Sequence, residues 1–215
     1  MKQKGNVLER FLTWSEKAGR MTDTAHHREF FMRELPGLLK DREAVEYLLK
    51  AIADGSEYPD VRSATIFKSE VVLYRDPLKL FSVRLYLWGP GDYDPVHDHN
   101  SWGVIGTALG TLDVINYERL DDGTSQEHAV LMECSRQAIP TGRTYSVFPL
   151  DRGIHRTGNA GEPAIVQVGV YGANITGRPY VNVFDLHDSS ISRLYLPHVR
   201  KRMLAGKALE TIRAV

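Results

Sequence analysis

Three histidines in two distant parts of the chain could together bind one metal ion. His97 and His99 are separated by a single residue, and His155 follows a Gly-Ile pair much later in the sequence. Side chains two residues apart in a strand point to the same side, so His97 and His99 share a face while Asp98 points away. Neutral imidazole is a common ligand of transition metals. If the strand carrying His155 lies across a barrel from the first pair, its imidazole completes a set of three nitrogens.

Short strands are expected to position these histidines. From about residue 61, short segments rich in Val, Ile, Tyr, Phe and Thr are separated by turn sequences such as Gly89-Pro-Gly. Short strands with regularly spaced turns predict an all-β sandwich or barrel. One segment, Leu80–Trp88, alternates well, which places Arg84, Tyr86 and Trp88 on one face and apolar side chains on the other.

Helices are expected at both ends of the chain. Near the N-terminus apolar side chains recur at helical spacing, as in Val7, Phe11 and Trp14, and the last segment reads as helical from about Pro197. We therefore expect a single domain over residues 1–215, with N-terminal helices over 1–60, a β-barrel over 61–190 and a C-terminal helical tail over 191–215.

Composition excludes several classes of protein. The 215 residues include 27 basic and 27 acidic side chains, and this balance argues against binding to nucleic acid or to a membrane surface. The first twenty residues do not resemble a signal peptide, and no apolar run is long enough to span a bilayer. The single cysteine, Cys134, excludes an internal disulfide. We expect a cytoplasmic protein, either a monomer or a small homo-oligomer.

The histidine segments resemble the two bipartite motifs of the cupin barrels. The first reads Gly-x5-His-x-His from Gly91, and the second reads Gly-x-His-x3-Asn from Gly153 to Asn159. Within the cupins, Trp88-Gly-Pro-Gly and the segment Pro95–Gly103 resemble the thiol dioxygenases, the group of cysteine dioxygenase and 3-mercaptopropionate dioxygenase. The likeness covers roughly residues 65 to 186.

The resemblance implies a fold, a cofactor and a reaction. The fold is an all-β cupin barrel, a double-stranded β-helix or jelly roll, with an N-terminal helical layer and a short C-terminal helix. One Fe(II) ion held by His97, His99 and His155 is the implied cofactor, and a small thiol and O2 are the implied substrates. Both oxygen atoms would be added to sulfur to give a sulfinate.

No carboxylate accompanies the three histidines in the motif. Gly103 or Val104 stands where many metal-binding cupins have a glutamate, and neither can bind a metal. Three neutral imidazoles leave the charge of a divalent ion undiminished, and such an ion favours an anionic thiolate. Zinc, manganese and nickel remain alternatives to iron, since three-histidine zinc sites also occur. A metal-dependent cupin of other chemistry, such as an isomerase or a non-thiol dioxygenase, and a non-enzymatic ligand-binding cupin are the alternative functions.

A strand in the family carries a Ser-x-His-x-Tyr relay, which this chain retains only in part. Tyr171 matches the tyrosine and would orient the oxygen, whereas Gln167 and Gly169 replace the serine and the histidine. Tyr86 and Trp88 would shape the pocket and exclude water. The two replacements leave open which thiol is oxidised. Because Cys134 lies in a different segment, we predict none of the cysteine–tyrosine crosslinks known in the family.

An arginine is expected to bind the acidic end of the substrate through a bidentate ion pair. Arg84 is the first candidate, because an arginine that faces into a barrel needs an anionic partner. Arg75 is the second, since Tyr74-Arg75-Asp76 resembles a substrate-binding segment of cysteine dioxygenase. Arg178 is the third, by its position downstream of Tyr171.

Overall fold

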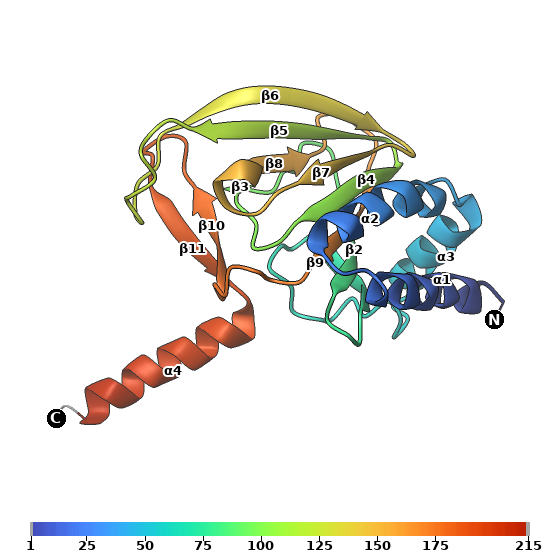
Figure 1. Cartoon of the computed structure of the whole chain (residues 1–215), viewed down its shortest axis with the longest axis horizontal. Helices are drawn as coiled ribbons and strands as arrows, with labels where there is room; N and C mark the ends of the chain where they lie inside the picture. Colours follow the sequence, from blue (N-terminus) through green and yellow to red (C-terminus); the bar gives the residue numbers. More distant parts are fainter. Residues whose placement is uncertain (1, 214–215) are drawn as a thin grey trace.

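The computed structural model describes residues 2–213 of the chain, with side chains from residue 6. Three helices come first, α1 (Lys2–Gly19), α2 (Thr24–Leu39) and α3 (Arg42–Ala53), and the last element is α4 (Pro197–Arg213). The strands lie between them. Figure 1 shows the first three helices gathered on one side of the strands, while α4 extends away from the opposite side.

The strands form two antiparallel sheets that pack face to face. Their inner faces share one apolar cluster, to which Ile105 of one sheet and Leu112 of the other both belong. This arrangement confirms the predicted double-stranded β-helix barrel. The five-stranded sheet has the order β1 (Glu70–Arg75), β2 (Phe81–Trp88), β9 (Ile165–Gly172), β4 (Gly103–Leu109), β7 (Thr144–Val147). The six-stranded sheet has the order β11 (Ile191–Tyr195), β10 (Tyr180–Phe184), β3 (Val96–His97), β8 (His155–Gly158), β5 (Thr111–Arg119), β6 (Leu131–Pro140).

The predicted alternation in β2 explains how the helices attach to the barrel. Phe81, Val83 and Leu85 are buried in a cluster that also contains helical residues, whereas Tyr86 and Trp88 belong to the cluster inside the barrel. The five-stranded sheet therefore buries one face against α1–α3 and the other against the second sheet. A strand with both faces covered is held rigidly, which suits a strand that positions side chains at a site.

Two aspartates define where helices of this layer begin. The side chain of Asp23 accepts a hydrogen bond from the backbone N–H of His26 at the start of α2, and Asp41 accepts one from Ala44 at the start of α3. Such caps satisfy backbone N–H groups that a helix leaves without partners. The helical layer expected over residues 1–60 is thus present, and α3 ends at Ala53.

The two segments that carry the histidines are neighbours in one sheet. The expectation that the strand of His155 lies across the barrel was wrong, because β3 pairs directly with β8 through His97 and His155. Asp94 fixes this pairing, since its carboxylate accepts hydrogen bonds from the backbone N–H and the hydroxyl of Thr157 at 2.5 and 3.1 Å. His97 and His155 therefore approach each other from adjacent strands, and His99 lies just after the end of β3.

The C-terminal segment contains a strand that the sequence analysis assigned to the helical tail. Residues 191–195 form β11, which pairs along its whole length with β10, from Tyr180 opposite Tyr195 to Phe184 opposite Ile191. The β-branched Ile191 and the aromatic Tyr195 at its ends are residue types that favour strands. The helix then begins at Pro197 as predicted, and none of its described residues is buried. Within residues 2–213, no helix has the length and apolar character needed to cross a membrane.

Candidate metal centre

The structure brings the three predicted histidines together inside the barrel. His97, His99 and His155 are buried, and one potential ligand atom from each lies within 4.8 Å of the others. The Nε2 atoms of His99 and His155 are 2.9 Å apart. Two nitrogens bound to one transition metal at about 2.0–2.1 Å, at right angles, stand about 3 Å apart. The spacing of this pair therefore fits joint coordination of one ion.

The other ring nitrogens of two of these histidines are occupied. Nδ1 of His97 donates a hydrogen bond to the carbonyl oxygen of Pro95 at 2.9 Å, and Nδ1 of His155 lies 2.9 Å from the hydroxyl of Tyr145. Such partners fix the orientation of a ligating imidazole and leave Nε2 free for the metal. Tyr145 was missed by the sequence analysis, although it alternates with Val147 in β7 and so shares its inward face.

Electrostatics favours the neutral, metal-binding form of the imidazoles. Burial lowers the pKa of His99 and of His155 well below the usual value of 6.5, and the neighbouring histidines lower it further. Neutral nitrogen donors suit zinc, iron, copper and nickel. The chemistry of this donor set therefore fits a divalent transition metal, and it does not by itself select which one.

Gly103 stands where many metal-binding cupins have a ligating glutamate, and the structure has no room for a larger side chain there. A Cβ atom at this position would lie 2.6 Å from Val147 and 3.0 Å from the ring of Tyr171. A carboxylate is nevertheless close by: Asp94 is buried, and its Oδ2 atom lies 3.8 Å from Nδ1 of His97. Burial raises the pKa of Asp94 to about 6. This carboxylate lies beside the histidine nitrogen that does not face the other two imidazoles.

A cavity of about 280 Å³ opens onto the three histidines. Four of the predicted substrate or catalytic residues line it, namely Arg84, Tyr86, Tyr171 and Arg178. Trp88 lies behind this wall and donates a hydrogen bond from its indole N–H to Gln167 at 3.0 Å.

Arg75 lies away from this site. It is exposed at the end of β1, opposite Ser82, and does not belong to the cavity wall. The structure therefore does not bring Arg75 to the cavity where the other candidate arginines lie. A bulge between Val72 and Tyr74 shifts the register of β1, and sequence similarity to a family segment does not reveal such a shift.

Arg84 has an anionic partner within the protein. Its Nη1 atom lies 2.7 Å from Oε1 of Glu70, whose side chain is 1% exposed, and its Nε donates to Ser82. The guanidinium also lies over the ring of Tyr171, 5.3 Å from the centroid. Arg84 is thus held at the cavity wall by a carboxylate, a hydroxyl and an aromatic face, independently of any ligand. No motif in the chain pointed to Glu70.

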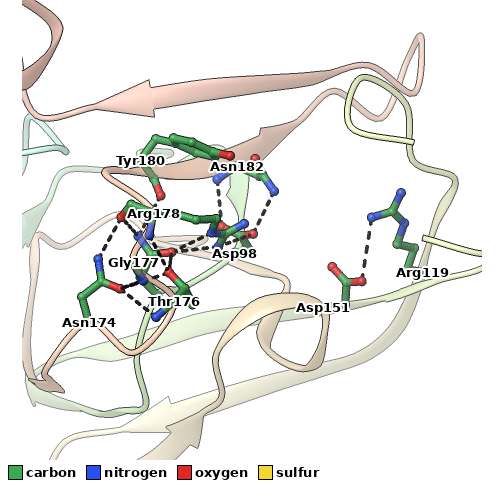
Figure 2. A network of polar contacts seen from close by, with 10 residues as sticks. Asp98, Arg119, Asp151, Asn174, Thr176, Gly177, Arg178, Tyr180 and Asn182 are labelled. Atoms are coloured by element: carbon green, nitrogen blue, oxygen red, sulfur yellow. Dashed lines mark hydrogen bonds and ion pairs between the residues drawn. The ribbon is translucent and has the colours of Figure 1, made fainter. Parts of the chain in front are cut away.

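Arg178 connects the histidine segment to the loop that precedes β10 (Figure 2). Its Nη2 atom lies 2.9 Å from Oδ2 of Asp98, and its Nε and Nη2 both donate to Oδ1 of Asn100. Asp98 points away from the metal centre, as predicted, and also accepts hydrogen bonds from the backbone and side chain of Asn182. Arg178 thus contacts the side chains of both residues that flank His99.

The ring of Tyr171 lies over two glycines. A Cβ atom at Gly169 would lie 2.7 Å from the ring and 2.9 Å from its hydroxyl, and Gly103 is in similarly close contact. Tyr171 therefore occupies the space above the position where the family has its relay histidine. Its ring also stacks on His99, with an interplanar angle of 12°. Burial raises the pKa of the Tyr171 hydroxyl, so it is a hydrogen-bond donor at neutral pH.

Comparison with known proteins identifies similar barrels. No known family model matches the chain. An uncharacterized conserved protein with a double-stranded β-helix domain from Klebsiella pneumoniae is 12% identical, with a TM-score of 0.37 over 58% of this chain and 82% of that chain. A cupin-like protein from Thermotoga maritima is 13% identical, with a TM-score of 0.38 over 54% of this chain and 75% of that chain. An oxalate oxidase in complex with the substrate analogue glycolate is 18% identical, with a TM-score of 0.38 over 58% of each chain.

These overlaps are too partial to transfer an activity or a ligand to this chain. The fold is defined instead by the chain's own two sheets, their strand order and their shared inner core. On that basis the protein has a cupin-type double-stranded β-helix, with a three-histidine group inside the barrel that can hold a metal ion.

Proposed function

We propose that the protein is a non-haem Fe(II) thiol dioxygenase that adds both atoms of O2 to the sulfur of a small thiol. The observation that carries the proposal is the composition of the metal group, which consists of three buried imidazoles and no carboxylate. A bound ferrous ion would keep its full positive charge, would favour the thiolate over the thiol, and would supply the redox chemistry that activates O2.

The reaction is balanced without a further reductant. A thiol and O2 combine to give a sulfinic acid, so that two sulfur–oxygen bonds form, the O–O bond breaks, and sulfur supplies all four electrons. The site therefore needs room for a thiol and O2 and no second co-substrate. A cavity of about 280 Å³ suits such small molecules.

The protein's own residues would bind and orient the thiol. Arg84 would bind an acidic end of the substrate, since it lines the cavity and its contact with Glu70 already orients the guanidinium. Tyr171, protonated and stacked on His99, would donate a hydrogen bond to oxygen as the reaction proceeds. Tyr86, which forms a T-shaped contact with Tyr171, would exclude water from that side.

Oxygen consumption by the iron-loaded protein tests this proposal. The panel contains cysteine, 3-mercaptopropionate, cysteamine and larger thiols, and mass spectrometry of the product measures the gain of two oxygen atoms. We expect uptake of O2 with at least one carboxylate-bearing thiol and weaker activity with cysteamine. Absence of uptake with every thiol would refute the proposal, as would full zinc occupancy without iron after anaerobic purification.

Two arginine variants test the proposed substrate contact. Arg84→Gln should raise KM for acidic thiols far more than for cysteamine, because only the former lose an ion pair. Arg75→Gln is the matched control, because this exposed arginine lies in the same sheet but outside the cavity wall. Equal effects of Arg84→Gln on acidic and non-acidic thiols would exclude Arg84 as the anchor.

A further inference from the structure

The metal cavity has a larger neighbour on the other side of one short segment. This second cavity, of about 550 Å³, is bounded by Trp88, Tyr93 and Leu194 among others. Ile66, Phe67 and Asp94 belong to the walls of both cavities. Since residues shared by two cavities separate them, these three side chains form the partition.

Phe67 is the bulky aromatic member of that partition. Its ring lies 4.8 Å from the ring of His97, centroid to centroid, and packs against the apolar cluster inside the barrel. Asp94, by contrast, is held by Thr157 in the pairing of the histidine strands. Replacing Asp94 would therefore disturb the metal ligands, whereas shortening Phe67 would open space beside them.

The backbone of Phe67 is tied to the charged wall of the metal cavity. Its N–H donates to Oε2 of Glu70 at 3.4 Å, and its carbonyl oxygen accepts the hydroxyl of Thr65 at 2.8 Å. The other oxygen of the Glu70 carboxylate pairs with Arg84. One buried carboxylate thus holds both the proposed substrate anchor and the partition in place.

We propose that Phe67 determines the size of ligand that the metal centre accepts. It confines ligands to the smaller cavity and excludes chains that would need to extend into the second one. Without the phenyl ring, a ligand bound at the histidines could extend past Ile66 and Asp94 toward the second cavity of about 550 Å³. The inference rests on the proposed function where it concerns thiols, because it then restricts the substrates to short ones.

Ligand binding to the cobalt-loaded protein tests the size limit without turnover. Under anaerobic conditions, the visible spectrum of Co(II) reports binding of mercaptoalkanoic acids of increasing chain length. Imidazole and a series of 1-alkylimidazoles provide a second set of ligands, because they bind the metal whether or not the protein acts on thiols. Wild-type protein should bind the short members of each set and reject the long ones.

Phe67→Ala should bind the long ligands at least tenfold more tightly than wild type and leave the affinity for the short ones almost unchanged. Phe67→Met approximately conserves the side-chain volume, so this variant should keep the same limit on ligand size as wild type. Phe148→Ala is the matched control, because Phe148 belongs to neither cavity wall. If Phe67→Ala does not fold, Phe67→Val provides the smaller side chain for the same measurement.

The outcomes separate the two proposals. Long imidazoles that bind wild type as tightly as Phe67→Ala would overturn the partition. A size effect with imidazoles, combined with no spectral change from any thiol, would uphold the partition and overturn the proposed function. A size effect with both series would support both.

Discussion

The Asp98–Arg178 pair provides a quantitative test of what stabilises the segment that carries His97 and His99. Asp98 is fully buried; its carboxylate forms an ion pair with Arg178 at 2.9 Å and accepts hydrogen bonds from the backbone and side-chain nitrogens of Asn182 at 2.8 and 3.0 Å. The side chain of Arg178 is 19% exposed. Replacing Arg178 leaves Asp98 buried without its counter-charge, and replacing Asp98 leaves the mostly buried Arg178 without its own.

The magnitude follows from these contacts. Hydrogen bonds to a charged group contribute about 1.5–3 kcal/mol each, and breaking a buried ion pair costs about 3–5 kcal/mol. Asp98→Ala should therefore lower the free energy of unfolding by about 3–5 kcal/mol. Asp98→Asn should lower it by about 1–3 kcal/mol, because an amide oxygen still accepts a hydrogen bond but the charge is lost. The double mutant with Arg178→Ala should show a coupling of about 1–3 kcal/mol.

Urea unfolding measures this coupling, provided that the m-value stays constant. The proteins compared are wild type, Asp98→Ala, Arg178→Ala and the double mutant. Arg119→Ala is a useful comparison, because this arginine pairs with Asp121 in a loop away from the metal centre. The mutants should also retain metal less well, since Asp98 lies between His97 and His99. Additive effects of the two substitutions, with a coupling under about 0.5 kcal/mol, would refute the view that this pair acts as a unit.

Four further predictions follow from the site and the chain ends. His155→Ala should abolish metal retention, measured by elemental analysis, and leave the circular dichroism spectrum unchanged. Tyr145→Phe should weaken metal affinity by about 10–100-fold in a competition assay, because His155 loses an orienting partner. Gly169→Ala should cost about 1–3 kcal/mol of unfolding free energy, since the added methyl group displaces the ring of Tyr171. Truncation after Arg200 should change the unfolding free energy by less than about 0.5 kcal/mol, because α4 buries no described residue.

Each of these substitutions has a control in the same chain. His128→Ala removes an exposed histidine outside the metal group. Tyr93→Phe removes a hydroxyl that bonds to Asp113 and not to a histidine. Gly37→Ala adds a methyl group where nothing lies within 4 Å. Retained metal in His155→Ala or an unchanged metal affinity in Tyr145→Phe would contradict the assigned roles of these residues. A Gly169→Ala variant as stable as Gly37→Ala would contradict the close contact with Tyr171. A large loss of stability on truncation would contradict the marginal role of α4.

The barrel and the histidine trio could be predicted because they depend on local patterns. Alternation in β2 set the inner and outer faces correctly, and the spacing of His97 and His99 placed Asp98 on the opposite side. The missing relay histidine was visible as Gly169, but its structural reason was not. The space above that glycine is occupied by Tyr171, and only the folded backbone shows this.

The partners of the site residues could not be predicted, because they depend on strand order and on contacts between distant segments. Pairing of β3 with β8 is decided by long-range register, so the relation of His155 to His97 could not be read from the spacing along the chain. Glu70 and Tyr145 approach Arg84 and His155 from other strands, where no motif connects them. A sequence pattern predicts which way a side chain faces, but not which side chain it meets.

The placement of the three histidines at one sheet has a consequence for how the chain could take up a metal ion. The adjoining strands β3 and β8, with the turn after β3, contribute all three imidazoles, while the large apolar core lies between the helices and the five-stranded sheet. A bound ion would therefore stabilise the contact between β3 and β8, and it would not link the two sheets of the barrel. We therefore expect the polypeptide to reach its native shape without a metal ion and to bind one afterwards, as a separate step of maturation.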